Sequence, residues 1–402
     1  MSAYLFWVNF SQKQFIILGK NNIMANILVL GAGMVGSAMA LDLAVNHSVT
    51  VADMNETALN KLKQRQAKIQ TTVLDVSNSN QLSVTLRNFD LILSAVPGFL
   101  GFKTLKTIIE AEKNVVDISF FPENALELNE LAKKKQVTAI VDCGVAPGLD
   151  NIILGYYDSF WEITEFECLV GGLPKIKKWP FYYKAPFSPI DVIEEYTRPA
   201  RFVEQGKVVT REPLTDCEFI DFEKVGTLES FNTDGLRSLI QTMPHIPFMK
   251  EKTLRYPGHV ELIKALKTTG FFDTTHIYGT NLSPLAFTSK ILFQNWKLAA
   301  QEPELTVMRV RLKGKENTEK RLQEVVFNLY DEYCPKTQIS SMARTTGYTA
   351  TAAVNMLLNN LFPNHGVFPP ELIGKSTECY HFIMNYLAER GIQMDVKIID
   401  LE

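Results

Sequence analysis

The fold of this 402-residue chain is decided by the stretch Ile27-Leu28-Val29-Leu30-Gly31-Ala32-Gly33-Met34-Val35-Gly36. A short apolar run, typical of a buried strand, stops at glycines spaced G-x-G-x-x-G, and a helical pattern begins at once and continues to about Val45. Gly31 suits a tight turn, Gly33 lets the backbone approach a pyrophosphate, and Gly36 lets the helix pack against its strand. The amides and the positive dipole at the helix start attract a phosphate. We therefore predict a dinucleotide site formed by Gly31, Ala32, Gly33, Met34, Val35 and Gly36.

A second apolar run, 49–52, ends at Asp53, which lies 17 residues beyond Gly36. A carboxylate at this place can accept hydrogen bonds from both hydroxyls of an adenosine ribose. The same negative charge repels a 2'-phosphate, and Met54 and Asn55 supply no basic partner for one. The sequence therefore predicts NAD as the cofactor, with NADP disfavoured.

Strands and helices alternate along the first 150 residues. We expect strands at 69–74, 91–96, 115–118 and 138–141, with helices at 56–66, 81–87, 104–112 and 122–135. Such alternation predicts a doubly wound parallel sheet of the Rossmann type, whose ligands lie outside the carboxyl ends of the strands. Asp75, Val76 and Ser94 fall at such ends, so we expect them to contact the cofactor.

The pattern of the sequence changes near Trp161. Strand-like alternation at 164–170 and 218–228, with many aromatic residues and prolines, predicts a second α/β domain with a mixed or antiparallel sheet. We place a NAD-binding Rossmann domain at 24–150, a substrate and dimerisation domain at 151–335, and C-terminal helices at 336–402, of which 341–359 is rich in small residues. Residues 1–23 read as a disordered or extended N-terminus, since Met24 directly precedes the first strand.

The composition excludes several classes of function. A formal charge of −3, with 46% hydrophobic and 21% charged residues, is that of an ordinary globular protein, and no basic cluster larger than 133–135 suggests nucleic acid. No apolar run reaches the roughly 18 residues that span a membrane. The five cysteines contain no CxxC pair, which predicts reduced thiols, a cytoplasmic protein and no metal site.

Unusual peptides beyond residue 140 make a family resemblance specific. They are Cys143-Gly-Val-Ala-Pro-Gly148, Gly171-Gly172-Leu173-Pro174, Phe231-Asn232-Thr233-Asp234-Gly235, Thr253-Leu254-Arg255-Tyr256-Pro257-Gly258-His259 and Ser340-Ser-Met-Ala-Arg-Thr-Thr-Gly-Tyr348. With the glycine turn, they resemble the saccharopine dehydrogenase family from about residue 25 to the C-terminus. The stretch Ser188-Pro-Ile-Asp-Val-Ile-Glu-Glu-Tyr-Thr-Arg-Pro-Ala200 resembles its lysine 6-dehydrogenase branch.

The resemblance implies a nicotinamide enzyme that moves hydride at a carbon bearing an amine of lysine or of a lysine conjugate. It also implies that the final helices return to the nucleotide domain and that the chain forms a homodimer or a higher homo-oligomer. Two departures concern the substrate. The glutamate-forming saccharopine enzymes of fungi carry an Asp where this chain has Ala146 and an Arg where it has Thr233. Because Thr cannot replace the planar fork that an Arg offers a carboxylate, these departures favour free lysine, which has one carboxylate-bearing arm fewer.

The leading hypothesis is therefore an NAD-dependent L-lysine 6-dehydrogenase, which releases ammonia and gives a semialdehyde that closes to piperideine-6-carboxylate. The alternative is saccharopine dehydrogenase. A second alternative, of another class, is a protein that binds a dinucleotide without turnover.

The resemblance also assigns roles to single residues. It implies that Arg255 clamps a substrate carboxylate, that Thr233 lies at the substrate, and that Ser119 and Phe120 lie where the substrate covers the nicotinamide. Asp234 is the expected catalytic residue, binding the amino group or assisting its deprotonation. The ordinary alternatives stay open: a salt bridge for the arginine, packing at a strand end for Ser119 and Phe120, and a capped turn for the aspartate.

Amine oxidation also needs a proton acceptor, because hydride leaves a carbon only when the attached amine has a free lone pair. The candidates are Asp117, Asp142, Asp234 and His259, and each would need a pKa close to the working pH. His259 fits equally well as a satisfied surface histidine.

Overall fold

The computed structural model describes residues 24–186, 189–299, 301–318 and 321–401, so the N-terminal extension expected at 1–23 lies outside it. The described residues form two compact units. Unit 1 is built from the chain up to Ile163, from 312–327 and from Ala343 onward, and unit 2 is built from 164–311 and 328–342.

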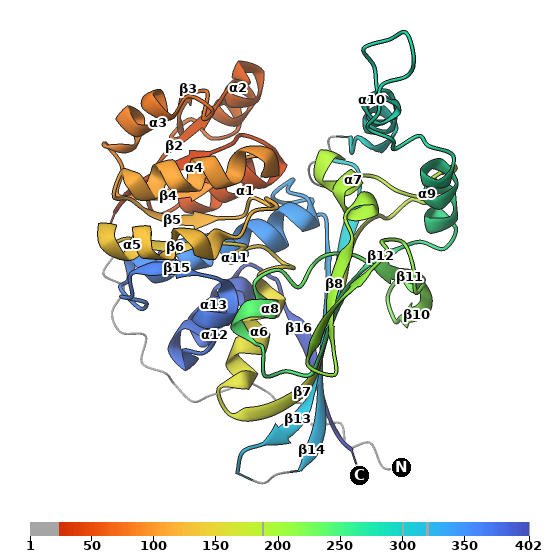
Figure 1. Cartoon of the computed structure of the whole chain (residues 1–402). Coiled ribbons are helices and arrows are strands. Elements are labelled where there is room, and N and C mark those ends of the chain that lie inside the picture. The colour runs from red at the N-terminus through yellow and green to blue at the C-terminus, as the bar shows by residue number, and fades with distance from the viewer. Residues whose placement is uncertain (1–23, 187–188, 300, 319–320, 402) are drawn as a thin grey trace. The chain divides into compact units, whose positions relative to one another are not determined.

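Unit 1 contains a seven-stranded sheet in the order β15-β6-β5-β4-β1-β2-β3, in which every neighbouring pair is parallel. Its strands are β1 (Asn26–Leu30), β2 (Ser48–Asp53), β3 (Gln70–Val73), β4 (Leu91–Ser94), β5 (Asn114–Asp117), β6 (Thr138–Ile140) and β15 (Gly366–Phe368). The order reverses beside β1, and helices alternate with the strands (Figure 1). This is the doubly wound Rossmann arrangement that the sequence predicts.

The helices of unit 1 begin and end where local chemistry directs them. They are α1 (Met34–Leu43), α2 (Glu56–Arg65), α3 (Ser79–Leu86), α4 (Gly98–Glu110), α5 (Asn129–Lys135), α6 (Leu149–Asp158), α11 (Ser341–Leu358), α12 (Pro370–Gly374) and α13 (Thr377–Glu389), with a 3₁₀ turn η1 (Ala125–Leu128). The side chain of Asn55 accepts a hydrogen bond from the amide of Ala58 and so caps α2, and Asn78 caps α3 in the same way.

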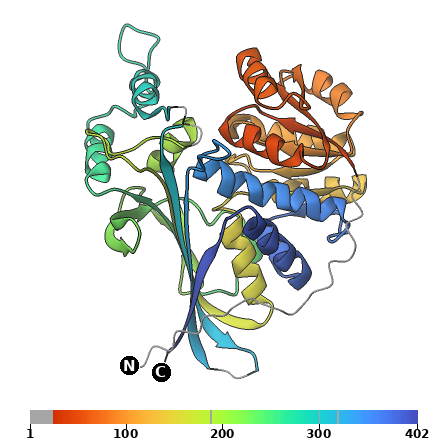
Figure 2. The same cartoon turned by 180° about the vertical axis from the view of Figure 1, so that it is seen from behind.

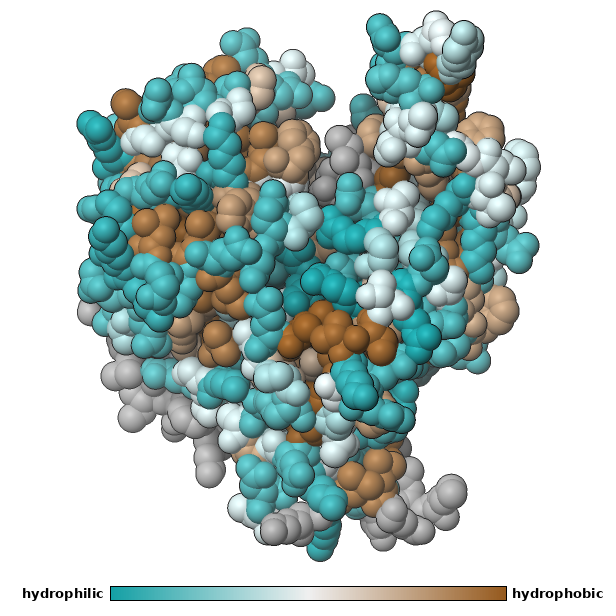
Figure 3. All heavy atoms as spheres, in the orientation of Figure 1, coloured by the Kyte–Doolittle hydropathy of each residue, from teal (hydrophilic) through white to brown (hydrophobic). Residues whose placement is uncertain are grey.

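Helices cover both faces of this sheet. On one face α3, α4 and α5 bury leucines and isoleucines such as Leu82, Leu105 and Ile108 against the strands. Between α4 and α5 some apolar atoms reach the surface among hydrophilic neighbours (Figure 3). On the other face α11 runs alongside α1 (Figure 2), and a Cβ on Gly347 would lie 3.0 Å from Cγ of Met39. The small residues of α11 therefore permit a close helix pair.

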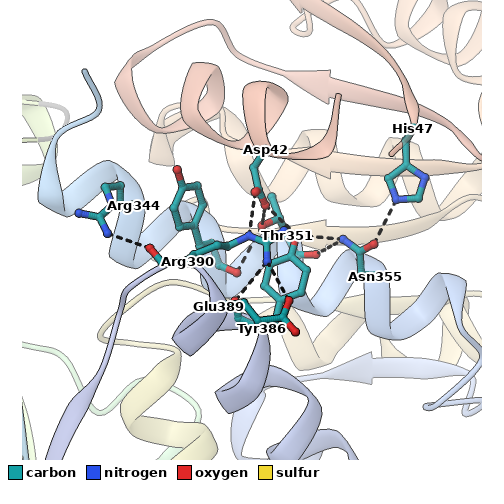
Figure 4. A network of polar contacts seen from close by, with 9 residues as sticks. Asp42, His47, Arg344, Thr351, Asn355, Tyr386, Glu389 and Arg390 are labelled. Atoms are coloured by element: carbon teal, nitrogen blue, oxygen red, sulfur yellow. Dashed lines mark hydrogen bonds and ion pairs between the residues drawn. The ribbon is translucent and has the colours of Figure 1, made fainter. Parts of the chain in front are cut away.

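A polar network ties the C-terminal helices to α1 (Figure 4). Oδ1 of Asp42 accepts a hydrogen bond from Nε of Arg390 at 2.7 Å. Its Oδ2 accepts from the hydroxyls of Thr351 at 2.6 Å and Tyr386 at 2.7 Å. The Arg390 guanidinium also lies 3.3 Å from the centroid of the Tyr386 ring. One carboxylate thus joins α1, α11 and α13 by charge-assisted hydrogen bonds.

Helices α6 and α12 approach each other through paired glycines. A Cβ on Gly155 would lie 1.9 Å from the carbonyl oxygen of Glu371, and a Cβ on Gly374 would lie 2.2 Å from the carbonyl oxygen of Ile152. Neither position has room for a methyl group, since backbone lies against both.

The second sheet is mixed and has the order β10-β11-β12-β7-β13-β14-β16, and β8 joins β9 to β12. Strands β8 to β12 consist of residues of unit 2, β16 consists of residues of unit 1, and β7, β13 and β14 contain residues of both. The strands of this sheet are β7 (Trp161–Pro174), β8 (Ala200–Glu204), β9 (Lys207–Arg211), β10 (Glu218–Phe222), β11 (Gly226–Asn232), β12 (Phe248–Arg255), β13 (Glu304–Glu316), β14 (Leu322–Glu332) and β16 (Met394–Asp400). Strand β12 pairs parallel with β7 and antiparallel with β11, which confirms the predicted mixed sheet.

The helices of unit 2 are α7 (Pro189–Thr197), α8 (Leu239–Thr242), α9 (His259–Thr268) and α10 (Pro284–Trp296). Aromatic residues of this unit, among them Tyr183, Tyr196, Phe231 and Trp296, form a buried cluster with aliphatic neighbours.

Several elements differ from the sequence expectations. Helix α4 begins at Gly98, six residues before the expected 104, with Pro97 as its N-cap. Gly101 in its first turn is buried against Phe121, where a Cβ would lie 2.5 Å from the ring. The expected helix 122–135 is a 3₁₀ turn followed by the seven-residue α5. The expected strand 218–228 is a hairpin, since Gly226 adopts φ +90° at its turn. Strand β15, only three residues long, was not expected.

Among the residues that the structure describes, no helix is long and apolar enough to cross a bilayer.

Candidate functional site

The glycine turn has the geometry of a phosphate site. Gly31 adopts φ +106°, and a Cβ there would lie 2.6 Å from the carbonyl oxygen of Ala95. A Cβ on Gly36 would lie 2.0 Å from the carbonyl oxygen of Gly31, so helix and turn are in backbone contact. A Cβ on Gly33, in contrast, would meet nothing within 4 Å. The open space lies at the glycine predicted to admit a pyrophosphate.

Helix α1 supports the same assignment. It is ten residues long, Gly33 caps it without a side-chain hydrogen bond, and no acidic residue lies in its first turn. The amides of Met34 and Val35 begin the helix and have no partner within it. Because the first turn holds no carboxylate, the positive end of the helix dipole is not neutralised from within the helix. Ala32 lies one step earlier, and its amide donates to Oδ2 of Asp53 at 2.6 Å. These residues fit the pyrophosphate of a dinucleotide.

Asp53 is the last residue of β2 and lies directly beside the turn. Its Oδ1 accepts a hydrogen bond from the amide of Asn55 at 2.7 Å, while Oδ2 holds Ala32. The carboxylate is therefore fixed in orientation, and each oxygen keeps a further lone pair for a ribose hydroxyl.

The other predicted cofactor residues lie at the carboxyl ends of the strands, as expected. Asp75 is half-buried just beyond β3, and its Oδ1 accepts a hydrogen bond from the amide of Ser77 at 2.8 Å. Hydrogen bonds from Ser77 hold the pKa of Asp75 below its usual range. Val76 is buried in the core of unit 1. Ser94 ends β4 and pairs in register with Asp117 at the end of β5. The structure thus brings Asp53, Asp75 and Ser94 to one edge of the sheet.

Asp117 is a fully buried carboxyl at that edge. Its Oδ1 accepts a hydrogen bond from the hydroxyl of Ser119 at 2.8 Å. Burial raises the pKa of Asp117 to about 7, and the carboxylate of Asp142 adds a smaller rise, whereas the hydroxyls of Ser94 and Ser119 lower it. A carboxyl of this kind can gain and lose a proton near neutral pH.

Of the two predicted substrate residues that follow Asp117, one is buried and the other is partly exposed. Ser119 is 3% exposed and Phe120 is half-buried. Desolvation and the neighbouring carboxylates of Asp142 and Asp117 raise the pKa of the buried Cys143 thiol to about 12, so this cysteine stays protonated.

In unit 2 the predicted residues Thr233 and Asp234 follow β11 and are both buried. The hydroxyl of Thr233 lies 3.0 Å from that of Thr253 on β12. Asp234 accepts three hydrogen bonds from Arg201: one from its amide at 3.2 Å, and two at 2.9 Å from Nε and Nη2. This bidentate pair holds the carboxylate, so its role as the catalytic residue stays a prediction. Sequence reasoning missed Arg201, although it directly follows the peptide 188–200.

Arg255 ends β12 and is 2% exposed. Its guanidinium donates to Oε2 of Glu195 at 2.6 Å and to the carbonyl of Leu254 at 3.0 Å. It also lies 4.4 Å from the centroid of the Tyr183 ring. Burial alone would lower the pKa of Arg255, but Tyr183, Tyr196 and Glu195 raise it overall. The side chain is firmly held inside unit 2, and its contact with a substrate carboxylate stays a prediction.

His259 is fully buried rather than a surface histidine, because it begins α9 within the aromatic cluster. Its Nδ1 lies 2.8 Å from the carbonyl oxygen of Phe181, which can only accept, so Nδ1 carries the proton. Its Nε2 therefore accepts the hydroxyl of Tyr196 at 2.9 Å. Burial, and then the charge of Arg255, lowers the pKa of His259 to about 3, although the Phe181 carbonyl raises it. A histidine so satisfied is a weak base at neutral pH.

No group of three or more histidine, cysteine or acidic side chains is placed to hold a metal ion anywhere in the described residues. The chemistry available at the carboxyl edge of the parallel sheet is therefore that of a phosphate-binding turn, a ribose-binding carboxylate and a titratable buried aspartate.

Comparison with protein families accounts for nearly the whole of this architecture. Residues 27–140 match the saccharopine dehydrogenase NADP binding domain, and residues 144–392 match the saccharopine dehydrogenase C-terminal domain. The chain belongs to the saccharopine dehydrogenase family. The resemblance inferred from the motifs is thus confirmed at the level of the family.

Curated relatives lie within this family. The chain is 26% identical over 270 residues to the NADP(+)-dependent, L-glutamate-forming saccharopine dehydrogenase of Saccharomyces cerevisiae, which covers 63% of this chain and 60% of that protein. It is also 26% identical to the corresponding enzyme of Pyricularia oryzae, over 62% of this chain and 58% of that one. The Arabidopsis thaliana alpha-aminoadipic semialdehyde synthase is 25% identical over 51% of this chain and 21% of its own length. The chain thus spans about 60% or less of these relatives, none of which is named a lysine 6-dehydrogenase.

Among solved structures, apo saccharopine dehydrogenase (L-Glu forming) from Saccharomyces cerevisiae superposes with a TM-score of 0.76 at 20% identity. The match covers 93% of this chain and all of the yeast chain. At this identity the likeness shows the fold, and it confirms a Rossmann sheet accompanied by a second mixed-sheet domain.

Proposed function

We propose that this protein is a nicotinamide-dependent oxidoreductase that acts on the carbon–nitrogen bond of a lysine-derived amine. The observation that carries this proposal is the turn 31–36, where the space beside Gly33 is open and the fixed carboxylate of Asp53 stands next to it. The bound dinucleotide would supply the hydride acceptor. Gly31, Gly33 and the amides at the start of α1 would hold its pyrophosphate, and Asp53 its ribose.

The relatives favour saccharopine, a secondary amine, as the substrate over free lysine. Both fungal proteins carry saccharopine dehydrogenase in their names, and they match more than 60% of this chain. Free lysine stays the second candidate because Ala146 and Thr233 stand where the fungal glutamate-forming enzymes have an Asp and an Arg. Inside unit 2, Thr233 bonds to Thr253 and offers no charge to a second carboxylate.

The preference for NAD over NADP is part of the proposal and rests on Asp53. A 2'-phosphate would bring a second negative charge to a carboxylate that two backbone amides already fix in place. The fungal relatives are named as NADP(+)-dependent enzymes, so this chain would differ from them in cofactor choice.

The test is an assay of the purified full chain with L-lysine or saccharopine and with each dinucleotide, following reduced nicotinamide by its absorbance. We expect saccharopine with NAD to give the higher kcat/KM. A higher kcat/KM with lysine would select the second candidate, and dinucleotide binding without turnover of either amine would select a non-catalytic protein.

A variant separates a specific site from a merely structural turn. Gly33→Asp places a carboxylate in open space, so we expect the variant to fold with an unchanged melting temperature and to lose dinucleotide binding. Gly226→Asp, at an open turn of unit 2, is the control for binding. Its φ of +90° strains a side chain, so this variant should melt at a lower temperature but bind the dinucleotide as the wild type does. Unchanged dinucleotide affinity in Gly33→Asp would overturn the assignment of the turn.

A further inference from the structure

The proposed reaction leaves one chemical role unassigned, the acceptor of the amine proton. Two of the candidates are engaged elsewhere. Three hydrogen bonds from Arg201 hold Asp234, and both ring nitrogens of His259 have partners in the core of unit 2. A base must have an open acceptor and a suitable pKa. The remaining candidates, Asp117 and Asp142, are acidic residues of unit 1.

Asp117 combines burial with incomplete hydrogen bonding. Its Oδ1 is held by the hydroxyl of Ser119, whereas within the described part of the chain its buried Oδ2 has no hydrogen-bond partner of accepted geometry, nor does the buried hydroxyl of Ser94. A charged oxygen without a partner in such a place costs more free energy than a protonated one. The arrangement suits a carboxyl that spends part of its cycle neutral.

Asp117 and Ser94 lie where the sequence predicts the nicotinamide end of the site. Asp117 ends β5 and pairs in register with Ser94 on β4, at the carboxyl edge where ligands of this fold bind. The amide of Ile118 donates to the carbonyl of Ser94, and that of Cys143 to the carbonyl of Asp117, which fixes the edge. Ser119 follows two residues later and lies against Gly101 of α4, where a Cβ would be 2.8 Å from its own.

We propose that Ser119 and Asp117 form a proton relay that deprotonates the substrate ammonium before hydride transfer, a step that rests on the proposed function. The ammonium N–H bond breaks as its proton joins Oγ of Ser119. The hydroxyl proton of Ser119 passes at the same time to Oδ1 of Asp117, along the existing 2.8 Å hydrogen bond. The amine is left neutral with its lone pair, and Asp117 is left as the neutral acid, which returns the proton to water after turnover.

The groups that face Asp117 set the pH at which the relay works. Ser94 on β4 and Ser119 favour the charged form, whereas Asp142, beyond β6, disfavours it, and the thiol of Cys143 stays neutral. The charge of Asp142 is the smaller of the two influences that raise the pKa of Asp117, after burial. The relay should therefore accept protons efficiently from about neutral pH upward.

The experiment compares the pH dependence of kcat/KM for amine oxidation in the wild type, Asp117→Asn and Ser119→Ala. In the wild type we expect kcat/KM to rise with pH through a limb near neutrality. Asp117→Asn should lose this limb and fall by roughly 10²- to 10⁴-fold, the usual contribution of general acid–base catalysis. Ser119→Ala should move the limb to higher pH, because it removes a hydrogen bond that lowers the pKa of Asp117.

Asp158→Asn is the matched control. Asp158, the last residue of α6, is another carboxylate of unit 1 whose side chain is mostly buried. It pairs with Lys375 at 3.1 Å, and Asp158→Asn should keep the wild-type limb of the pH profile. A limb that is unchanged in both Asp117→Asn and Ser119→Ala would overturn the relay. A Ser119 that only hydrogen-bonds Asp117 would also move the limb but would leave the plateau of kcat/KM above it unchanged, whereas the relay requires a lower plateau in Ser119→Ala.

A second readout needs no turnover. Isotope-edited infrared spectroscopy of protein labelled with [4-¹³C]aspartate should show a protonated carboxyl band that titrates near neutral pH and is absent in Asp117→Asn. If no such band appears, the relay is overturned even when the enzyme is active. If the wild type oxidises neither amine, the proposed function fails, while the titrating band would still support Asp117 as a proton acceptor.

Discussion

Replacing Glu195 by glutamine tests how the charge of the buried Arg255 is balanced. The two side chains are 20% and 2% exposed, and their closest atoms lie 2.6 Å apart. Glutamine keeps the size and one acceptor of glutamate but removes the negative charge. Breaking a buried pair by neutralising one partner typically costs 3–5 kcal/mol, because the other charge is left uncompensated.

The structure places the expected cost at the lower end of that range. Arg255 would keep the carbonyl of Leu254 at 3.0 Å and the hydroxyls of Tyr183 and Tyr196, both at 3.4 Å. The Glu195 carboxylate is also partly reached by water. We therefore expect Glu195→Gln to lower the free energy of unfolding of unit 2 by about 3 kcal/mol, or more than a hundredfold in its unfolding equilibrium.

The assay is urea unfolding followed by the fluorescence of Trp296, which is fully buried with its ring centroid 5.4 Å from that of Tyr183. The matched control is Glu204→Gln, because Glu204 pairs with Arg211 in the same unit but with side chains 42% and 45% exposed. An exposed pair contributes less than about 1 kcal/mol.

Two results would refute the reasoning. The first is an equal midpoint for Glu195→Gln and Glu204→Gln. The second is a double variant, Glu195→Gln with Arg255→Met, that recovers none of the loss, since removing the orphaned charge should restore stability if that charge is its cause.

Three further outcomes follow from single residues. Burial lowers the pKa of His259 from 6.5 to about 3, so the stability that its neutral form contributes is complete above pH 6.5. This contribution declines as the pH falls toward 3, by up to roughly 1.4 kcal/mol per pH unit. Acid unfolding of His259→Gln should lack this dependence, and identical acid midpoints for variant and wild type would contradict it. Asp53→Asn should raise the ratio of kcat/KM for NADP to that for NAD by at least about tenfold, since one like charge at close range costs about 1–4 kcal/mol; steady-state assays with both cofactors decide this, and an unchanged ratio would remove Asp53 as the selector. Gly155→Ala and Gly374→Ala should each lower the melting temperature of unit 1 by several degrees, because a methyl group at either site meets backbone within 2.2 Å. Gly33→Ala in the same unit is the control, since its φ is −68° and a Cβ there meets nothing within 4 Å; melting temperatures equal to that of the control would show that the helices can move apart.

The parallel sheet could be predicted because its signals are local. Apolar-rich runs such as 27–30 and 91–96 stop at glycine or proline, and the helix starts follow at once. Where tertiary packing overrides local propensity, prediction failed. The first turn of α4 contains Gly98 and Gly101, which disfavour a helix on their own, yet the second glycine is what lets α4 lie against Phe121.

The candidate site divides in the same way. The glycine turn and Asp53 follow from spacing along the chain. The partner of Arg255, in contrast, stands 60 residues earlier, and that of Asp234 stands 33 residues earlier, so neither pair could be inferred from spacing. Burial of His259 and the raised pKa of Asp117 are likewise properties of the packed structure, which a side chain's identity does not reveal.

The return of the chain from residue 343 into unit 1 has a consequence for biosynthesis. Strand β15 extends the sheet beside β6, and Arg390 on the segment after α13 neutralises Asp42 on α1. A nascent polypeptide that has left the ribosome only as far as unit 2 therefore lacks the pieces that cover the back of its first sheet. The nucleotide-binding half, although its first strands are translated early, is completed only by 343–401, so a deletion within that range removes residues of unit 1 and none of unit 2.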